Sequence, residues 1–170
     1  MTSPAKKINE LDRRLERASV METPVHAVVA RYSTNAAQSI ADSTVTIVDF
    51  EDVSYDTDSA VTTGAAWKFT CPTGYGGYFS VIAMIQFAST AAWAAGEALG
   101  LYIFKGGVQY STIYYDEAGS ATTRYRQAPG SDAVNLADGE YIDIRVVQVS
   151  GGALALHNVA TRNHVAISRI

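Results

Sequence analysis

Two patterns of apolar residues divide the chain into a short helical head and a long β body. In the head, apolar residues recur every three or four positions and so share one side of a helix; they are Ile8, Leu11, Leu15 and Ala18. From residue 24 onward, runs rich in Val, Ile, Tyr, Phe and Thr alternate with Gly, Ser, Asp and Asn clusters. Pro24 disfavours helical geometry in the preceding residue. We therefore predict an N-terminal lead followed by a short helix within residues 1–23, and a β domain at 24–170.

The β domain is expected to consist of many short strands separated by turns. The predicted strands are 25–32, 44–50, 53–55, 66–71, 77–88, 98–105, 108–115, 122–129, 140–149, 154–158 and 164–170. No long helical pattern alternates with these strands, so a parallel α/β sheet is excluded. Frequent short strands favour an antiparallel β-sandwich or jelly roll.

The strand predicted at 77–88 is apolar on both faces. One face is formed by Phe79, Val81, Ala83, Ile85 and Phe87. The other face contains Ile82 and Met84, which an isolated sandwich would expose to water. Loops could cover this second face, but we favour burial against another subunit. The residues predicted for this interface strand are Phe79, Val81, Ile82, Met84 and Ile85.

The helix is too short to be stable alone, because isolated helices below about 12–15 residues are marginal in water. Its heptad pattern places Ile8 and Leu15 at a, and Leu11 and Ala18 at d. Lys7 then falls at g and Asp12 at the following e, as in interchain ion pairs of parallel coiled coils. We predict a trimeric coiled coil that acts once a β interface has brought the chains together. The alternative is a solvated helix that lies on its own domain.

Net charge and the length of the apolar runs exclude two classes of function, nucleic-acid binding and membrane insertion. The net charge at pH 7 is −4, the wrong sign for a nucleic-acid-binding protein. No apolar run approaches the roughly 20 residues needed for membrane insertion, and the charged N-terminus lacks a signal-peptide pattern. Residues 1–20 carry five basic and three acidic residues, whereas the remainder is acidic. The basic head is therefore suited to docking on an acidic surface.

No pattern of catalytic or metal-binding residues emerges. The single cysteine, Cys71, is expected to be an inert buried thiol. His26, His157 and His164 lack metal-ligand spacing, although a zinc or pH-sensing site between the last two stays open. The acidic cluster 51–58 is expected to cap a turn rather than to bind Ca²⁺. We find no facing carboxylate pair, serine elbow or phosphate loop, and predict no enzyme activity, metal or cofactor.

Aromatic and arginine side chains suggest one candidate contact surface for a receptor or glycan. Tyrosine and arginine are common in binding hot spots, and exposed aromatic rings stack on sugars. This predicted rim consists of Trp93, Tyr110, Tyr114, Tyr115, Arg124, Tyr125 and Arg126. The alternative is that these rings pack within the sheet and the trimer.

Three groups of residues, in this order, resemble the C1q/TNF-like jelly-roll domain over residues 25–170. The first group, Phe69, Pro72, Gly77, Tyr78 and Phe79, is similar to the family's Phe-x-x-Pro-x-x-Gly-Tyr-Tyr signature, with extra residues at 73–76. The second, Leu101, Tyr102, Lys105 and Gly106, is similar to its L-Y-K-N-G hairpin, with Phe104 inserted. The third, Leu136, Gly139, Tyr141 and Ile142, resembles its L-x-x-G-D-x-V turn, with Glu140 in place of Asp.

The resemblance implies an all-β antiparallel sandwich that forms a homotrimer with one sheet buried at the three-fold axis. With the short helix ahead of it, the chain looks like tailed-phage structural proteins. We therefore expect a virion protein made in the host cytoplasm, most simply a minor tail or tail-fibre component. Its partners would be its own copies, other virion proteins through the helix, and a host-surface glycan or protein. The alternatives are a head decoration protein and a soluble ligand or lectin, and the absence of a collagen-type repeat disfavours the soluble class.

Overall fold

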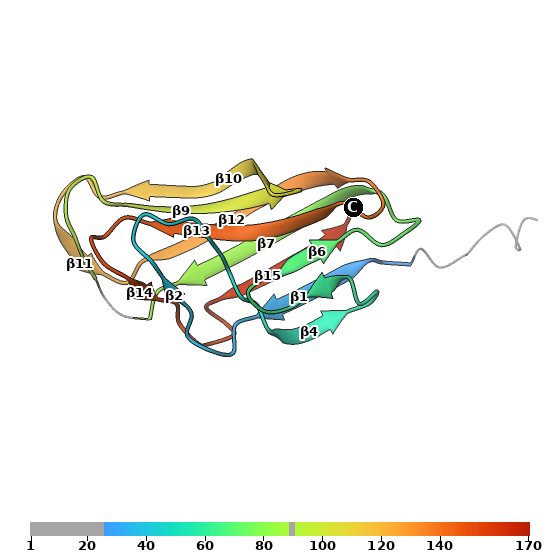
Figure 1. The fold of residues 1–170 in the computed structure, drawn as a ribbon, viewed down its shortest axis with the longest axis horizontal. Helices are drawn as coiled ribbons and strands as arrows, with labels where there is room; N and C mark the ends of the chain where they lie inside the picture. Colours follow the sequence, from blue (N-terminus) through green and yellow to red (C-terminus); the bar gives the residue numbers. More distant parts are fainter. Residues whose placement is uncertain (1–25, 89–90) are drawn as a thin grey trace, which may run out of the picture.

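The computed structural model describes residues 26–88 and 91–170, in which two antiparallel sheets pack face to face (Figure 1). The predicted helix, with Ile8, Leu11, Leu15 and Ala18, lies outside these residues. Within the described part of the chain, no helix is long and apolar enough to cross a membrane. The expected all-β antiparallel sandwich is confirmed.

The first sheet has five strands in the order β12-β7-β15-β1-β4. These strands are β12 (Gln127–Leu136), β7 (Gly77–Gln86), β15 (His164–Arg169), β1 (Val29–Ser33) and β4 (Asp52–Asp56). All four pairings are antiparallel. We call this the five-stranded sheet.

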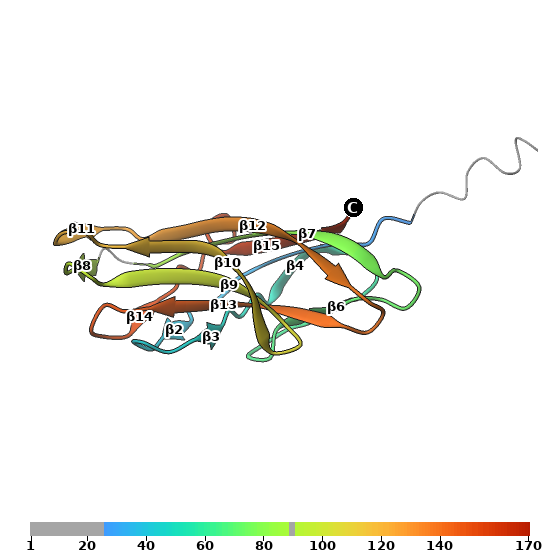
Figure 2. The same ribbon diagram turned by 90° about the horizontal axis from the view of Figure 1, so that it is seen from above.

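The second sheet has six strands, five of them in the order β10-β9-β13-β6-β5. They are β10 (Val108–Glu117), β9 (Ala98–Lys105), β13 (Tyr141–Gln148), β6 (Lys68–Thr70) and β5 (Val61–Thr62), with β3 (Thr46–Ile47) paired to β13. Two small ladders complete the fold: β11 (Thr122–Arg124) with β8 (Ala91–Trp93), and β14 (Leu154–Ala155) with β2 (Ser39–Ile40). Figure 2 shows the sheets as two elongated layers.

The core fills the space between the sheets because alternate residues of each strand point inward. The fully buried side chains include Phe79, Val81 and Ile85 on β7, Leu99, Leu101 and Ile103 on β9, and Ile142, Ile144 and Val146 on β13. Phe69 packs on Phe79 with ring centroids 5.4 Å apart, which joins the two layers. Cys71 is buried beside this core, and burial raises the pKa of its thiol, as expected for an inert cysteine.

The strand prediction fails mainly around β12. The sequence pattern predicts one strand at 122–129, whereas the structure has β11 and then β12, which continues to Leu136. Gly130, Ser131 and Asp132 fall outside the predicted strand because they have low strand propensity. They are held in a strand by an unbroken register with β7, from Gln127 opposite Gln86 to Leu136 opposite Gly77. Tertiary pairing here overrides local propensity.

One carboxylate ties two loops together at one end of the sandwich. Asp138, in the turn between β12 and β13, accepts hydrogen bonds from the amides of Gly74 (2.7 Å) and Gly76 (2.9 Å). These bonds stabilise the ionised form and lower the pKa of Asp138. The loop before β7 is thus fixed to the turn that leads into β13.

Replacing Asp138 with alanine should speed hydrogen exchange at Gly74 and Gly76. In the unaltered chain the same tie contributes stability above the ordinary carboxyl pKa of 3.8, and it is lost as the pH falls through the lowered pKa. Amide exchange followed by NMR measures both effects. Asp132→Ala is the matched control, because Asp132 accepts only from the amide of its neighbour Ala133 (2.8 Å) among the bonds found for it. Equal exchange rates at Gly74 and Gly76 in both variants would contradict the role of Asp138 in binding these two amides.

Candidate oligomerisation interface

The candidate functional site is the face of the five-stranded sheet that points away from the core. The strand register aligns its residues in rows across β12, β7, β15 and β1. We call this surface the outer face. It consists of Pro129, Ser131, Ala133 and Asn135 on β12, Tyr78, Ser80, Ile82 and Met84 on β7, His164, Ala166 and Ser168 on β15, and Val29, Arg31 and Ser33 on β1.

The outer face is unusually neutral for a surface that meets solvent. Ile82 and Tyr78 are 51% and 57% exposed. Among the residues of the outer face on β12, β7, β15 and β1, Arg31 alone carries a formal charge at neutral pH, since His164 is then mainly neutral. The edge strand β4 adds Asp52, opposite Ser33. Within the described part of the chain, no hydrogen bond or ion pair is found for Arg31. Such a combination of exposed apolar area and few charges is typical of the core of a protein–protein interface.

The opposite face of the molecule, on the six-stranded sheet, differs in its charges, because Asp143 is 2% exposed and is paired with Arg145. Arg145 makes a two-pronged contact with Asp143, at 2.6 and 3.1 Å, and its guanidinium lies 4.0 Å from the Phe104 ring centroid. These two charges therefore have partners in their own chain. The difference between the two faces makes the outer face of the five-stranded sheet the candidate interface.

The predicted interface strand needs a correction. Phe79, Val81 and Ile85 have no exposed surface in the single chain, so they belong to the core and cannot contact a neighbouring subunit. Only Ile82 and Met84 of the five predicted residues lie on the outer face. The alternation along β7 assigns each side chain to one of two faces, and the prediction merged both.

The residues of the predicted rim differ in their exposure. Tyr110, Tyr115 and Tyr125 are 48%, 57% and 55% exposed, and Tyr114 is half-buried. Tyr110 and Tyr115 are both on β10, five residues or about 17 Å apart along the strand. Arg124 belongs to β11, but its side chain lies outside the description.

Trp93 and Arg126 must be removed from the rim, because they are 1% and 3% exposed. The Arg126 guanidinium lies 4.6 Å from the Trp93 ring centroid and forms an ion pair with Asp116. In the sequence, exposed contact residues are indicated by a tryptophan in a run of small residues and by a nearby arginine. The structure instead pairs them with each other inside the protein.

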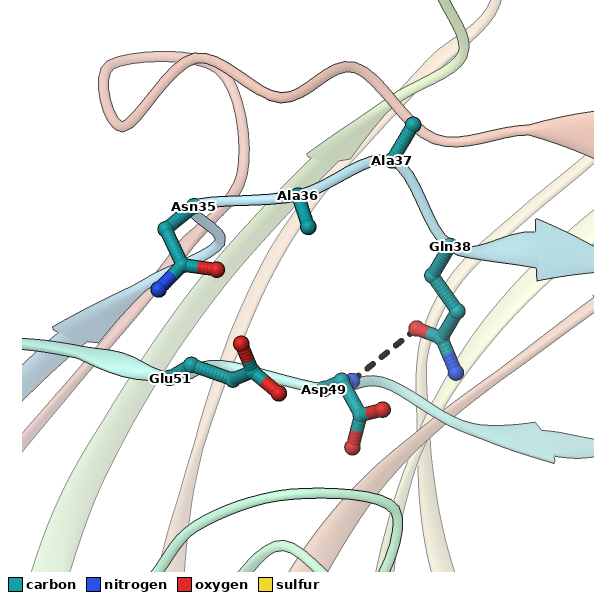
Figure 3. A pocket seen from close by; sticks show the side chains of 6 residues that line it. All are labelled: Asn35, Ala36, Ala37, Gln38, Asp49 and Glu51. Carbon is teal, nitrogen blue, oxygen red and sulfur yellow. Dashed lines mark hydrogen bonds between the residues drawn. The ribbon is translucent and has the colours of Figure 1, made fainter.

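A shallow pocket lies between the segment 35–38 and two acidic residues, Asp49 and Glu51 (Figure 3). Gln38 closes one side, since its carbonyl oxygen accepts from the Asp49 amide at 2.9 Å and its amide donates to Ile47 at 2.7 Å. Burial, with a smaller contribution from Glu51, raises the pKa of Asp49. No basic or nucleophilic side chain lines the pocket, so its composition offers no catalytic arrangement.

The remaining acidic residues of the segment 51–58 serve local structure. Asp56 accepts from the amides of Ala60 (3.0 Å) and Val61 (3.2 Å) and from the Tyr32 hydroxyl (2.9 Å). His26 bonds Asp58 at 2.9 Å. Among the described residues, no three His, Cys, Asp or Glu side chains gather as a metal site.

The sequence pattern alone does not place Arg31 and His164 on the outer face with Ile82 and Met84. The available signal was period-two alternation in 29–33 and 164–169, where buried residues alternate with the outward Arg31, His164 and Ala166. That signal shows which residues share a face, but not that β1 and β15 are neighbours of β7. The strand order supplies this information.

Comparison with known proteins identifies the fold. No protein-family model and no curated protein sequence matches the chain. Murine APRIL matches with a TM-score of 0.58 and 12% identity, over 85% of this chain and 99% of that one. Eiger TNF from S. frugiperda matches at 0.57 and 10%, over 85% and 92%. The globular domain of the zebrafish complement 1qA protein matches at 0.57 and 14%, over 85% and 98%. At such identities the likeness concerns architecture, and the chain has the antiparallel jelly-roll fold of TNF and C1q domains.

Proposed function

We propose that this chain is a non-enzymatic structural protein that assembles as a homotrimer through the outer face. The observation that carries the proposal is the neutral, partly apolar surface around Ile82 and Met84, opposite a face on which Arg145 is paired with Asp143 of the same chain. A ring of three copies buries one such surface on each and closes without leaving a free interface. The TNF/C1q-like fold supports this assembly.

Within this role, the protein is a virion component of a tailed phage, specifically a minor tail or tail-fibre protein. Support comes from the sequence resemblance and from the basic head that precedes an acidic body. Residues 1–23 dock on other virion proteins and strengthen the trimer as a coiled coil, while the β domain projects outward. The exposed tyrosines Tyr110, Tyr115 and Tyr125 are then the candidates for contact with a host-surface glycan or protein. The same docking chemistry suits a head decoration protein, the second candidate.

Analytical ultracentrifugation of the purified full chain at micromolar concentration tests the trimer. We expect a sedimentation-equilibrium mass of three chains at neutral pH. A monomer at that concentration would remove the proposed assembly.

Immunogold electron microscopy of native particles tests the location. An antibody raised against residues 24–170 should label the tail. Labelling confined to the head would make the protein a decoration protein, and unlabelled particles would remove the virion role.

A further inference from the structure

His164 lies on β15, the central strand of the five-stranded sheet, in the row at one end of the outer face. It is half-buried at the start of β15, where its backbone lies opposite Met84 of β7 on one side and Ser33 of β1 on the other. The next outward residue of β15, Ala166, lies opposite Arg31, so Arg31 and His164 are diagonal neighbours on adjacent strands. The site lies next to Ile82, which pairs with Ala166.

The surroundings of the His164 imidazole favour its neutral form in the single chain. Its Nδ1 atom is buried and has no hydrogen-bond partner in the described part of the chain. In the neutral tautomer with hydrogen on Nε2, protonation places an N–H at Nδ1, where no acceptor is available. Burial, and then the charge of Arg31, lower the pKa of His164. The missing acceptor at Nδ1, the burial of the ring and the positive charge of Arg31 therefore all disfavour the protonated form of His164.

The titratable groups around His164 provide no adjacent counter-charge. On β1 the neighbour is Arg31, and the loop before β15 contributes His157 and Arg162. Asp52 and Tyr55 lie on β4, two strands away, and Asp52 accepts a hydrogen bond from Asn35 at 3.0 Å. The outward residues of β7 and β12 are not ionisable near neutral pH. Two cations side by side are thus the result of protonation.

We propose that assembly through the outer face is acid-sensitive and that His164 of each chain is the sensor. The inference rests on the proposed function, since it requires the outer face to be the trimer interface. Contact with a second copy removes water from Arg31 and His164, and the charged imidazole loses more solvation than the neutral one. The assembled state therefore binds protons less readily than the separated chains do.

The direction of the pH dependence follows from linkage. The ordinary pKa of histidine is 6.5, and that of His164 is lower in the folded chain. Above this ordinary value His164 is neutral in every state, and the trimer has its full stability. As the pH falls through the lowered pKa of the separated folded chain, that chain gains a proton on His164 that the assembled state binds less readily, so the trimer weakens.

The test compares trimer dissociation of the full chain at pH of about 7.5 and about 5, by sedimentation equilibrium over a concentration series. We expect the dissociation midpoint of the native chain to rise about tenfold or more at the lower pH, and that of His164→Gln to change less than about twofold. The matched control is His26→Gln, because His26 is exposed and bonded to Asp58. It should keep the native pH dependence.

Two further measurements keep the inference testable if His164→Gln folds poorly. Histidine NMR titration of the native chain should place the pKa of His164 below the ordinary histidine value of 6.5. Arg31→Gln should reduce the pH dependence, since it removes the neighbouring cation. A trimer whose midpoint does not change with pH, or tightens in acid, overturns the sensor and leaves the proposed function standing. A monomer at both pH values overturns the proposed function itself.

Discussion

Gly130→Ala is expected to destabilise the native fold by about 3 kcal/mol or more. Gly130 lies on β12, the edge of the five-stranded sheet, where β10 of the other sheet comes closest. A Cβ atom at this position would overlap the carbonyl group of Ile113 on β10. Because the obstacle is backbone, no side-chain rotation relieves the overlap, and the two sheets must separate at this edge. Chemical denaturation followed by fluorescence measures the loss.

Two other glycines provide a graded control. Gly119→Ala should leave stability within about 0.5 kcal/mol, since nothing lies within 4 Å of the added Cβ. Gly100→Ala should fall between the two, because its added Cβ meets the Tyr102 ring, a side chain that can move. A Gly130→Ala protein that unfolds at the same denaturant concentration as Gly119→Ala would show that β10 and β12 do not approach so closely.

Gly130 also illustrates what the sequence could and could not predict. Strands such as β7, β9 and β13 have dense apolar alternation, and the sequence pattern predicts all three of them. The Gly130–Asp132 stretch of β12 has the composition of a turn, and only pairing with β7 makes it a strand. Close backbone approach between sheets leaves no pattern in the sequence except the glycine itself.

The residues of the candidate site also divide into those that the local sequence predicts and those that only the strand order brings together. The two-faced character of β7 is a local property, so Ile82 and Met84 could be predicted as outward residues in need of cover. Arg31 and His164 are far from β7 in sequence and join it only through the strand order. Trp93 and Arg126 were mistaken for a contact surface because residue type indicates binding potential, whereas exposure depends on tertiary packing.

Ile82→Arg is expected to convert the trimer into monomers at micromolar concentration, a loss of at least about hundredfold in affinity. Ile82 is the most exposed aliphatic side chain of the outer face and stands between Ser131 and Ala166 in its row. An arginine here would have to be desolvated in the interface, and it would add a second cation to a row that already contains Arg31. Sedimentation equilibrium measures the mass of the assembly directly.

The matched control is Val149→Arg, which adds the same charge to a 37%-exposed valine just after β13, on the six-stranded sheet. It should stay trimeric. Both variants should unfold within about 0.5 kcal/mol of each other as isolated chains, since neither position lies in the core. If Ile82→Arg sediments as three chains, the outer face is not the interface. Dissociation of Val149→Arg alone would move the contact to the six-stranded sheet, where the paired charges of Arg145 and Asp143 would then have to be broken or shared between subunits.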